Sequence, residues 1–393
     1  MHLEEIRALE KRYVMQTYGR NEIALVSGEG ARLRDSEGKE YIDLTSGIGV
    51  NCLGYHHPAL SAAISDQAQK LMHCSNLFYS EPMAQVAEHL VKSTGLSRVF
   101  FANSGAEANE AMIKTARKYS SDRYGKDRYK IITLRQSFHG RTMTTLMATG
   151  QDRFHQYFYP LPEGFAYVEA GDLAQFKSCA DEHVCAVIME MIQGEGGVLP
   201  LDQAFVQEVS AYCKAHDILV CVDEVQTGIG RTGTLFCYAQ YGIEPDIVSM
   251  AKGLGGGVPI GAILCGEKCA DTLQPGQHGS TFGGNLLACR AAQTVLSVVD
   301  QPQFLASVKE KGEYIREQLL AMHSPAIREV RGMGLMLGIG VDPQKRSDYV
   351  RALQEKGVLV LTAGEDTIRL LPPLVITKED IDQALACMKE VLK

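Results

Sequence analysis

The chain has 393 residues, of which 45% are hydrophobic and 22% charged, a composition typical of a globular protein. This length exceeds the size at which a single core usually stops growing, so we expect one large and one small domain. The net charge of -8, without any block of lysine and arginine, argues against a nucleic-acid or anionic-membrane partner, and we expect small-molecule partners.

The N-terminal segment and the cysteines bear on where the protein works. Residues 1–18 are rich in charged side chains and lack the apolar region of a signal peptide, and no stretch approaches the apolar length of a membrane span. The 11 cysteines are an odd number, and many lie inside apolar runs, which is typical of reduced, buried thiols. We therefore predict a cytoplasmic protein.

Two short clusters could suggest a metal site. Cys265 and Cys269 are close in sequence but have no second pair at zinc-site spacing, and His56 and His57 lie in a turn without a third ligand nearby. We expect no metal.

Short apolar runs alternate with helical segments along the chain. The predicted strands are Val99–Phe101, Lys130–Leu134, Ala186–Met189, Ile218–Val222 and Ile247–Met250. Their hydrophobicity is continuous rather than alternating, which predicts strands covered on both faces. The sequence therefore predicts an α/β fold with a mostly parallel sheet flanked by helices.

Helical patterns follow several of these strands. We predict helices over Ala106–Lys118 and Asp202–His216, a nearly continuous helix from Leu286 to about Met322, a short strand at Val358–Leu361 and a closing helix from Lys378. The domain prediction places residues 1–48 and 296–393 in a small α+β domain built from both termini, and residues 49–295 in the large domain.

Two motifs indicate nucleotide chemistry at first sight. Asp223 and Glu224 end an apolar strand, as in Mg-ATP enzymes, but the phosphate loop G-x-x-x-x-G-K-[ST] is missing from the sequence. Gly228, Gly230 and Gly233 match the dinucleotide fingerprint, but they do not directly follow a strand and no helical pattern continues from them. Neither motif favours a nucleotide site.

Lys252 stands between a predicted strand and a turn with four glycines. One interpretation is that this lysine simply lies in solvent at the end of a strand. The other is that the apolar strand end lowers the pKa of its amine, which favours the neutral form that Schiff-base chemistry needs. Asp223 ends a second strand, and both residues can meet at the carboxyl edge of one sheet, where α/β folds bind ligands. Asn103–Ala106 opens a helix, whose free amides suit a phosphate monoester.

Read together, these motifs resemble the class III, or ω-amino, aminotransferases of the fold type I pyridoxal phosphate (PLP) family. The resemblance covers nearly the whole chain and rests on Ser104–Ala108, Ser137–Arg141, Gln193–Gly197, Asp223–Gly228, Ser280–Asn285 and Arg369–Pro373. Met191 and Leu286 depart from the family pattern, which usually has proline at both positions. Both changes concern backbone stiffness more than chemistry. The resemblance implies a seven-stranded sheet in the large domain.

The resemblance implies how PLP is held. Lys252 would form a Schiff base with the cofactor and shuttle the reacting proton, and Asp223 would keep the pyridine nitrogen protonated. The other implied cofactor contacts are Ser104, Gly105 and Ala106 at the phosphate, Phe138 and Val225 at the ring faces, Gln226 at the 3-hydroxyl, and Thr281 from a second subunit. This set implies a homodimer with shared active sites.

Three charged residues are implied to handle substrate carboxylates, together with Ser280 as a further substrate contact. Arg141 would anchor the remote carboxylate of the amine donor, and Arg369 would bind the α-carboxylate of glutamate. Glu195 would pair with Arg369 while the donor is bound. The alternative is that either arginine is an ordinary solvated surface residue.

The family members that the sequence resembles most act on N-acetylornithine in arginine biosynthesis, with 2-oxoglutarate as acceptor and N-acetylglutamate 5-semialdehyde and glutamate as products. The motifs are Thr45–Ile48, Ser75–Phe78 and Phe138–Arg141. Ile48 stands where ornithine-specific members tend to carry tyrosine, and an apolar residue suits an acylated amine. Succinylornithine, ornithine, acetyllysine-type and 4-aminobutyrate donors remain open.

Two rival classes make different predictions. A nicotinamide dehydrogenase built on Gly228–Gly233 would show no visible absorbance, whereas a PLP enzyme would be yellow. A non-catalytic relative would have lost Lys252 or Asp223, and both are present.

Overall fold

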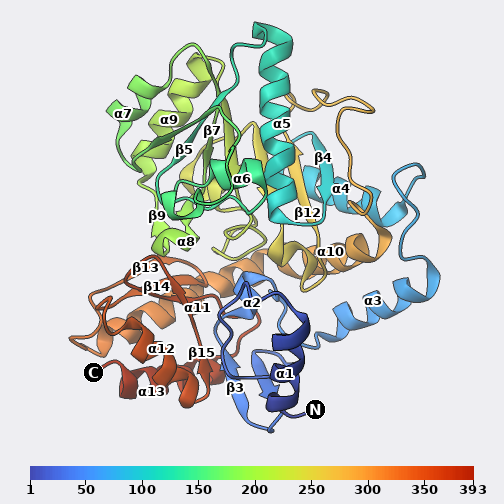
Figure 1. Cartoon of the computed structure of the whole chain (residues 1–393). Helices are drawn as coiled ribbons and strands as arrows, with labels where there is room; N and C mark the ends of the chain where they lie inside the picture. The colour runs from blue at the N-terminus through green and yellow to red at the C-terminus, as the bar shows by residue number, and fades with distance from the viewer.

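The computed structural model describes all residues from Met1 to Lys393. A seven-stranded sheet with helices on its faces occupies one half of the molecule, and the N- and C-terminal segments lie together in the other half (Figure 1). No helix is both long and apolar enough to span a bilayer.

The large sheet has the strand order β4-β12-β11-β10-β7-β5-β6. Its strands are β4 (Arg98–Ala102), β5 (Lys130–Leu134), β6 (Phe165–Val168), β7 (Val184–Met189), β10 (Leu219–Asp223), β11 (Ile247–Met250) and β12 (Gly261–Cys265). All neighbouring pairs are parallel except those of β12, which runs antiparallel to β11 and β4. The predicted mostly parallel α/β sheet is confirmed.

The five strands predicted for this sheet all occur, but two other strands of the sheet were missed. β6 is an edge strand in which three of the four residues are only half-buried, and β12 is a five-residue run that begins at a glycine. Such short apolar runs do not distinguish a strand from a piece of buried loop or helix. β6 is placed in the sheet by pairing with β5, and β12 by pairing with β11 and β4. The local sequence does not reveal these pairings.

The continuous hydrophobicity of the central strands has the expected cause. Every residue of β7, β10 and β11 is buried. Along β10, Val220 and Val222 belong to a cluster of 69 buried residues, whereas Leu219 and Cys221 belong to a second cluster of 17. Successive side chains of a strand point to opposite faces, so both faces of this sheet are covered by apolar core.

The helices around this sheet are α3 (Pro58–Lys70), α4 (Glu81–Thr94), α5 (Gly105–Tyr124), α6 (Met143–Ala148), α7 (Leu173–Cys179), α9 (Gln203–Ala215) and α10 (Leu286–Val299). Two of them begin at residues expected to start helices. The Asp202 side chain accepts a hydrogen bond from the Phe205 amide at 2.8 Å, and Ser104 caps α5 in the same way. Short pieces complete this half: η1 (Asp152–Phe154), β8 (Ile192–Gln193), α8 (Gly194–Gly197), β9 (Leu199–Pro200), η2 (Cys237–Tyr241) and η3 (Lys252–Gly255).

The helix expected from Leu286 to about Met322 is interrupted. α10 ends at Val299, and α11 (Pro302–Ala321) begins after two intervening residues. Pro302 has no amide hydrogen to donate, so it is tolerated in the first turn of a helix and not in its interior. The prediction of helical structure was right, and the prediction of continuity was wrong.

Both ends of the chain contribute to the remaining sheets. One sheet contains β1 (Leu25–Glu29), β2 (Arg32–Asp35), β3 (Glu40–Asp43) and β15 (Val358–Leu359), and the other contains β13 (Glu329–Met333), β14 (Met336–Gly340), β17 (Thr367–Leu370) and β16 (Leu361–Ala363). The helices here are α1 (Leu3–Tyr13), α2 (Ser46–Gly49), α12 (Arg346–Glu355) and α13 (Lys378–Val391). The domain boundaries remain a prediction.

The strand expected at Val358–Leu361 is divided between these two sheets. β15 pairs with β3 in parallel, whereas β16 pairs with β17. Pairing partners distant in sequence decide this split, and a single apolar run cannot reveal it.

Candidate active site

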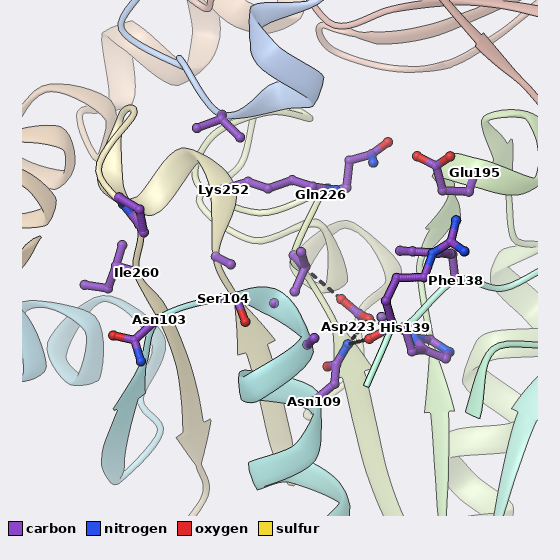
Figure 2. Close-up of a pocket in the computed structure, with 18 of the residues that line it drawn as sticks. Asn103, Ser104, Asn109, Phe138, His139, Glu195, Asp223, Gln226, Lys252 and Ile260 are labelled. Carbon is purple, nitrogen blue, oxygen red and sulfur yellow. Dashed lines mark hydrogen bonds and ion pairs between the residues drawn. The ribbon is translucent and has the colours of Figure 1, made fainter. Parts of the chain in front are cut away.

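A cavity of about 440 Å³ opens at the carboxyl ends of β10 and β11. Most of the predicted site residues line it, several of them visible in Figure 2: Ser104, Gly105, Ala106, Phe138, Arg141, Glu195, Asp223, Val225, Gln226 and Lys252. Arg369 lies just behind this lining, whereas Ser280 and Thr281 do not line the cavity. The strand order accounts for the site, because the carboxyl ends of adjacent parallel strands form one edge.

Lys252 follows Ala251, the first residue after β11, and lines the cavity. Its backbone φ of +42° is one that non-glycine residues seldom adopt, and such conformations concentrate at functional sites. Burial lowers the pKa of the Lys252 amine to about 8, although the nearby Glu195 carboxylate opposes this shift. An appreciable share of this lysine is therefore neutral near physiological pH.

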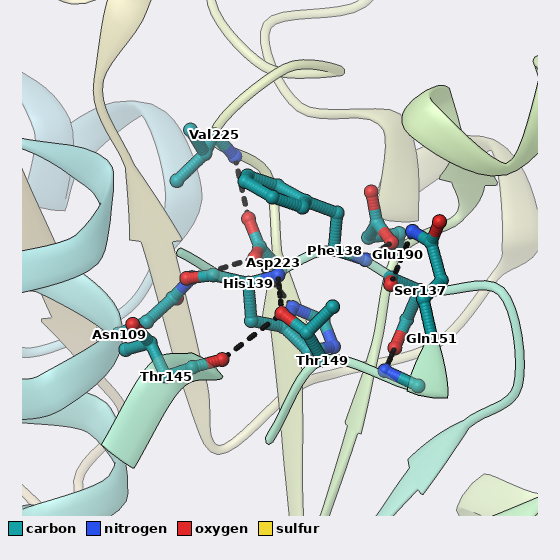
Figure 3. A network of polar contacts seen from close by, with 11 residues as sticks. Asn109, Ser137, Phe138, His139, Thr145, Thr149, Gln151, Glu190, Asp223 and Val225 are labelled. Atoms are coloured by element: carbon teal, nitrogen blue, oxygen red, sulfur yellow. Dashed lines mark hydrogen bonds and ion pairs between the residues drawn. The ribbon is translucent and has the colours of Figure 1, made fainter. Parts of the chain in front are cut away.

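Asp223 ends β10 and is 3% exposed. Its Oδ2 accepts hydrogen bonds from Asn109 Nδ2 and pairs with His139 Nδ1, both at 2.7 Å, and its Oδ1 accepts from the Val225 amide at 3.0 Å (Figure 3). These contacts fix the orientation of the carboxylate before any ligand binds.

Two of these partners were not identified from the sequence. His139 was given no role of its own within the motif Ser137–Arg141, and Asn109 was not singled out. The structure brings both against Asp223. A usable signal was present for Asn109, because it lies on α5 among buried apolar residues such as Met112, Ile113 and Ala116, where a polar side chain requires a partner.

The protonation of His139 is coupled to this carboxylate. Burial lowers the pKa of its imidazole, but the contact with Asp223 outweighs burial and raises the pKa above its ordinary value. His139 Nε2 is buried without a hydrogen-bond partner. The Asp223–His139 pair therefore holds its proton more tightly than an exposed imidazole would.

Glu190 is a further buried acid that the sequence did not single out. Its Oε2 accepts a hydrogen bond from the Phe138 amide at 2.9 Å, which ties the end of β7 to the segment that carries His139. Burial raises the pKa of the Glu190 carboxyl to about 7.

The N-terminus of α5 forms another wall of the cavity. Ser104 Oγ accepts a hydrogen bond from the Glu107 amide at 3.2 Å, so this serine acts as an N-cap. Gly105 is required by packing, since a Cβ there would lie 2.7 Å from Val225 Cγ1. The first amides of the helix and its positive dipole end make this wall suitable for a phosphate group.

Arg369 and Glu195 form an ion pair next to the cavity. Arg369 Nη1 lies 2.6 Å from Glu195 Oε1 and donates to Gln226 Oε1 at 3.1 Å. The arginine is 2% exposed. Burial raises the pKa of Glu195, but Arg369 outweighs it, and the net pKa lies below the ordinary value.

Arg141 differs in its surroundings. It is exposed, forms no ion pair, and stacks its guanidinium 4.1 Å from the centre of the Phe154 ring. A charged group on an aromatic face keeps its hydrogen-bond donors free for a ligand.

Ser280 and Thr281 lie outside the cavity of this chain. Thr281 is exposed, and Ser280 Oγ accepts a hydrogen bond from Asn103 Nδ2 at 3.0 Å. Asn103 does line the cavity, so Ser280 is connected to it only through this neighbour.

Residues from the N-terminal segment reach the same region. Val50 lines the cavity, whereas Ile48 does not and is 45% exposed with a φ of +64°. The structure therefore does not bring Ile48 into the cavity of a single chain.

The two departures from the family pattern are accommodated locally. Met191 is fully buried, and its carbonyl oxygen accepts a hydrogen bond from Tyr241 Oη at 2.9 Å. Leu286 is the first residue of α10, whose start is capped by Asn285. Neither residue lines the cavity.

Comparisons with known proteins agree with this arrangement. The profile of the family "Aminotransferase class-III" matches residues 13–392. An acetylornithine aminotransferase from Haemophilus ducreyi is 50% identical over 394 aligned residues, covering 100% of this chain and 99% of the relative.

Solved structures share the fold over the whole chain. An N-acetylornithine aminotransferase from Stenotrophomonas maltophilia superimposes with a TM-score of 0.84 at 38% identity, covering 98% of this chain and 97% of the other. An ornithine aminotransferase from Toxoplasma gondii, described with partial occupancy of PLP at its active site, superimposes with a TM-score of 0.95 at 32% identity, covering 100% and 94%. This chain therefore belongs to the class-III aminotransferases.

Proposed function

We propose that this chain transfers the terminal amino group of N-acetylornithine to 2-oxoglutarate, with PLP as cofactor, giving N-acetylglutamate 5-semialdehyde and glutamate. The observation that carries the proposal is the Glu195–Arg369 pair beside the cavity that holds Lys252 and Asp223. A transaminase needs a cofactor site and a substrate site that accepts two different carboxylates, and this arrangement provides both.

The residues present fit PLP. The N-terminus of α5 suits its phosphate, and the Gly105 contact with Val225 leaves no side chain in the way. Asp223 would pair with a protonated ring nitrogen, and Phe138 lines the same cavity beside it. When bound, PLP supplies an aldehyde that links to amines and a ring that accepts electrons from the bond being broken.

Lys252 provides the amine for cofactor attachment and for proton transfer. With a pKa of about 8, its Nζ is available as a neutral base near neutral pH. The same atom would take the proton from the substrate carbon that bears the amino group and deliver it to the adjoining carbon of the cofactor. Lys252 suits this role because it is the only amine that lines the cavity.

Asp223 keeps its negative charge directed at one position. Asn109, His139 and the Val225 amide occupy its other hydrogen-bonding directions, so the carboxylate does not need to reorient when the ring nitrogen arrives.

The arginines divide the two substrates. Arg141, with free donors, would bind the carboxylate of N-acetylornithine while Glu195 keeps Arg369 occupied. Glutamate and 2-oxoglutarate would displace Glu195 and bind Arg369 through their α-carboxylates. Because the Glu195–Arg369 ion pair can break and re-form, a single cavity can accept substrates of different length.

The choice of donor is supported by the 50% identity to an acetylornithine aminotransferase over the whole chain. Ornithine, succinylornithine, acetyllysine-type substrates and 4-aminobutyrate are the competing donors.

We further propose a cytoplasmic homodimer with shared active sites. Thr281 is exposed and outside its own chain's cavity, as a residue that serves the partner's site would be. Large apolar side chains near it in sequence or structure are also exposed, among them Leu77, Phe78 and Phe282. All 11 cysteines are free, in keeping with a reducing compartment.

The experiment is a donor panel with 2-oxoglutarate as acceptor and glutamate formation as readout. We expect kcat/KM for N-acetylornithine to exceed that for ornithine and 4-aminobutyrate by about tenfold or more. A higher kcat/KM for ornithine would overturn the donor assignment and leave the family membership intact.

A further inference from the structure

Arg231 is among the most deeply buried charged residues of the chain, with 2% of its surface exposed. It lies in the glycine-rich segment Gly228–Gly233, which follows the loop carrying Asp223 and Gln226. Burial lowers the pKa of its guanidinium to about 10, so it remains charged at neutral pH. No carboxylate forms an ion pair with it, which makes its contacts unusual for a buried cation.

Three segments that are distant in sequence provide its partners. Arg231 Nη1 donates to the carbonyl oxygens of Leu335 at 2.9 Å and Pro372 at 2.5 Å. Nη2 lies 3.4 Å from Ser46 Oγ, and Ser46 itself donates to the Leu371 carbonyl at 2.6 Å. One guanidinium therefore connects the β13–β14 turn, the end of β17 and the start of α2.

The glycines of this segment match the dinucleotide fingerprint by spacing, but their role here is to allow close packing. A Cβ on Gly230, whose φ is +81°, would lie 2.5 Å from Val299 Cγ1 of α10. On the other side, a Cβ on Gly334 would lie 2.6 Å from the carbonyl carbon of Thr232. Close approach of backbone on both sides is what allows Arg231 to reach its partners.

These partners adjoin the substrate side of the active site. Pro372 comes three positions after Arg369, which belongs to β17. Arg369 contacts Gln226, and Arg231 comes five positions after Gln226 in the same connection. The connection after β10 and strand β17 are thus joined at two points, once through Arg369 and once through Arg231.

We propose that Arg231 is a positioning residue that holds β17 against the connection after β10 and so places Arg369 for the α-carboxylate of glutamate and 2-oxoglutarate. This inference rests on the proposed function and adds a residue that touches neither substrate nor cofactor. Its loss should affect the reaction with glutamate more than the reaction with the amine donor, because the donor depends on Arg141, which is held elsewhere.

The test uses Arg231→Met and Arg231→Lys in the cofactor-loaded enzyme. Methionine fills the space without donors, and lysine keeps the charge but replaces the fork by one nitrogen. We expect the Kd of glutarate, a dicarboxylate without an amine, to rise about tenfold or more in calorimetry, with a matching loss in the glutamate half reaction. The N-acetylornithine half reaction should change less than about threefold. An unchanged Kd, or equal losses in both half reactions, overturns the proposal.

Arg316→Met is the matched control. Arg316 also donates to backbone carbonyls, those of Val330 at 2.8 Å and Gly332 at 2.6 Å, but these belong to β13. Its replacement should leave the Kd of glutarate within about twofold of wild type. A rise equal to that of the Arg231 variants would mean that general loosening of the sheet is the cause, and would overturn the proposal.

A double variant and a milder variant complete the design. In an Arg369→Ala background, Arg231→Met should add no further loss of glutarate binding, and a fully additive loss contradicts the mechanism. If the Arg231 variants do not fold, Ser46→Ala removes one of the contacts and should raise the Kd about threefold, whereas no rise overturns the proposal. A wild-type enzyme that does not react with glutamate would instead refute the proposed function itself.

Discussion

The floor of the cavity, formed by Asn109, His139 and Asp223, differs from its substrate side, here called the rim, where Arg141 lines the cavity and Arg369 lies just behind the lining. On the floor, all three side chains are buried, and Asn109 and His139 are each bonded to Asp223. On the rim, one arginine is exposed without an ion pair and the other is paired with a carboxylate that a ligand can replace. The difference indicates that the floor serves a resident group and the rim serves ligands that come and go.

The largest effect is expected at Lys252, which joins the two regions. Lys252→Ala should abolish multiple turnover, because no other amine is available in the cavity for cofactor attachment. Borohydride reduction of the wild-type enzyme followed by peptide mapping checks this. Label on another lysine would sink the assignment.

The next largest effects separate the two arginines of the rim. Arg369→Ala should impair the glutamate half reaction, and Arg141→Ala the N-acetylornithine half reaction, each by about 2–5 kcal/mol in transition-state binding. Glu195→Ala should favour glutamate over the donor, since Arg369 then has no competing partner. Rapid-mixing measurements decide the matter, and equal losses in both half reactions would refute the division of labour.

On the floor, Asp223→Ala should weaken cofactor binding and slow proton abstraction by on the order of a hundredfold. The carboxylate is the only acid bonded to Asn109 and His139, so no neighbour can replace it. Single-turnover kinetics with N-acetylornithine measure the effect. An unchanged rate removes Asp223 from the mechanism.

Asn109 tests whether orientation of that carboxylate matters separately from its charge. Asn109→Ala removes the 2.7 Å hydrogen bond to Asp223. It should slow proton abstraction about tenfold, in the same half reaction as Asp223→Ala does. Asn109→Asp, which cannot donate when ionised, is the stricter variant. Rates equal to wild type in both would show that His139 and the Val225 amide suffice.

The smallest effect concerns pH. Cofactor attachment to apoenzyme requires neutral Lys252, so its rate should rise with pH and level off above the pKa of about 8. Between pH 7 and pH 8 the increase should be about fivefold, the change in the neutral fraction of such an amine. Stopped-flow absorbance measures it. A rate that still climbs tenfold per pH unit above pH 9 would mean that burial does not lower the pKa of this lysine.

Much of the fold was predictable because hydrophobic pattern is a local signal. β5 and β11 occur as predicted, and α5 and α9 begin within one residue of their predicted starts. β12 and the split between β15 and β16 were not predictable, because both depend on strands far away in sequence.

The candidate site shows the same limit in another form. Lys252 and Asp223 follow apolar strands, so elementary topology places them at one edge. The roles of Glu190 and Arg231 depend on contacts across the fold, and no local pattern distinguishes them from other polar residues.

The most direct test of the account is an absorbance titration of the purified enzyme. The account predicts a yellow protein whose visible band disappears on addition of N-acetylornithine alone and returns on addition of 2-oxoglutarate, with one glutamate formed per site in each cycle. The Lys252→Ala variant should not complete this cycle. A wild-type protein without a visible band, or a band that N-acetylornithine leaves unchanged while another amine removes it, would contradict the account.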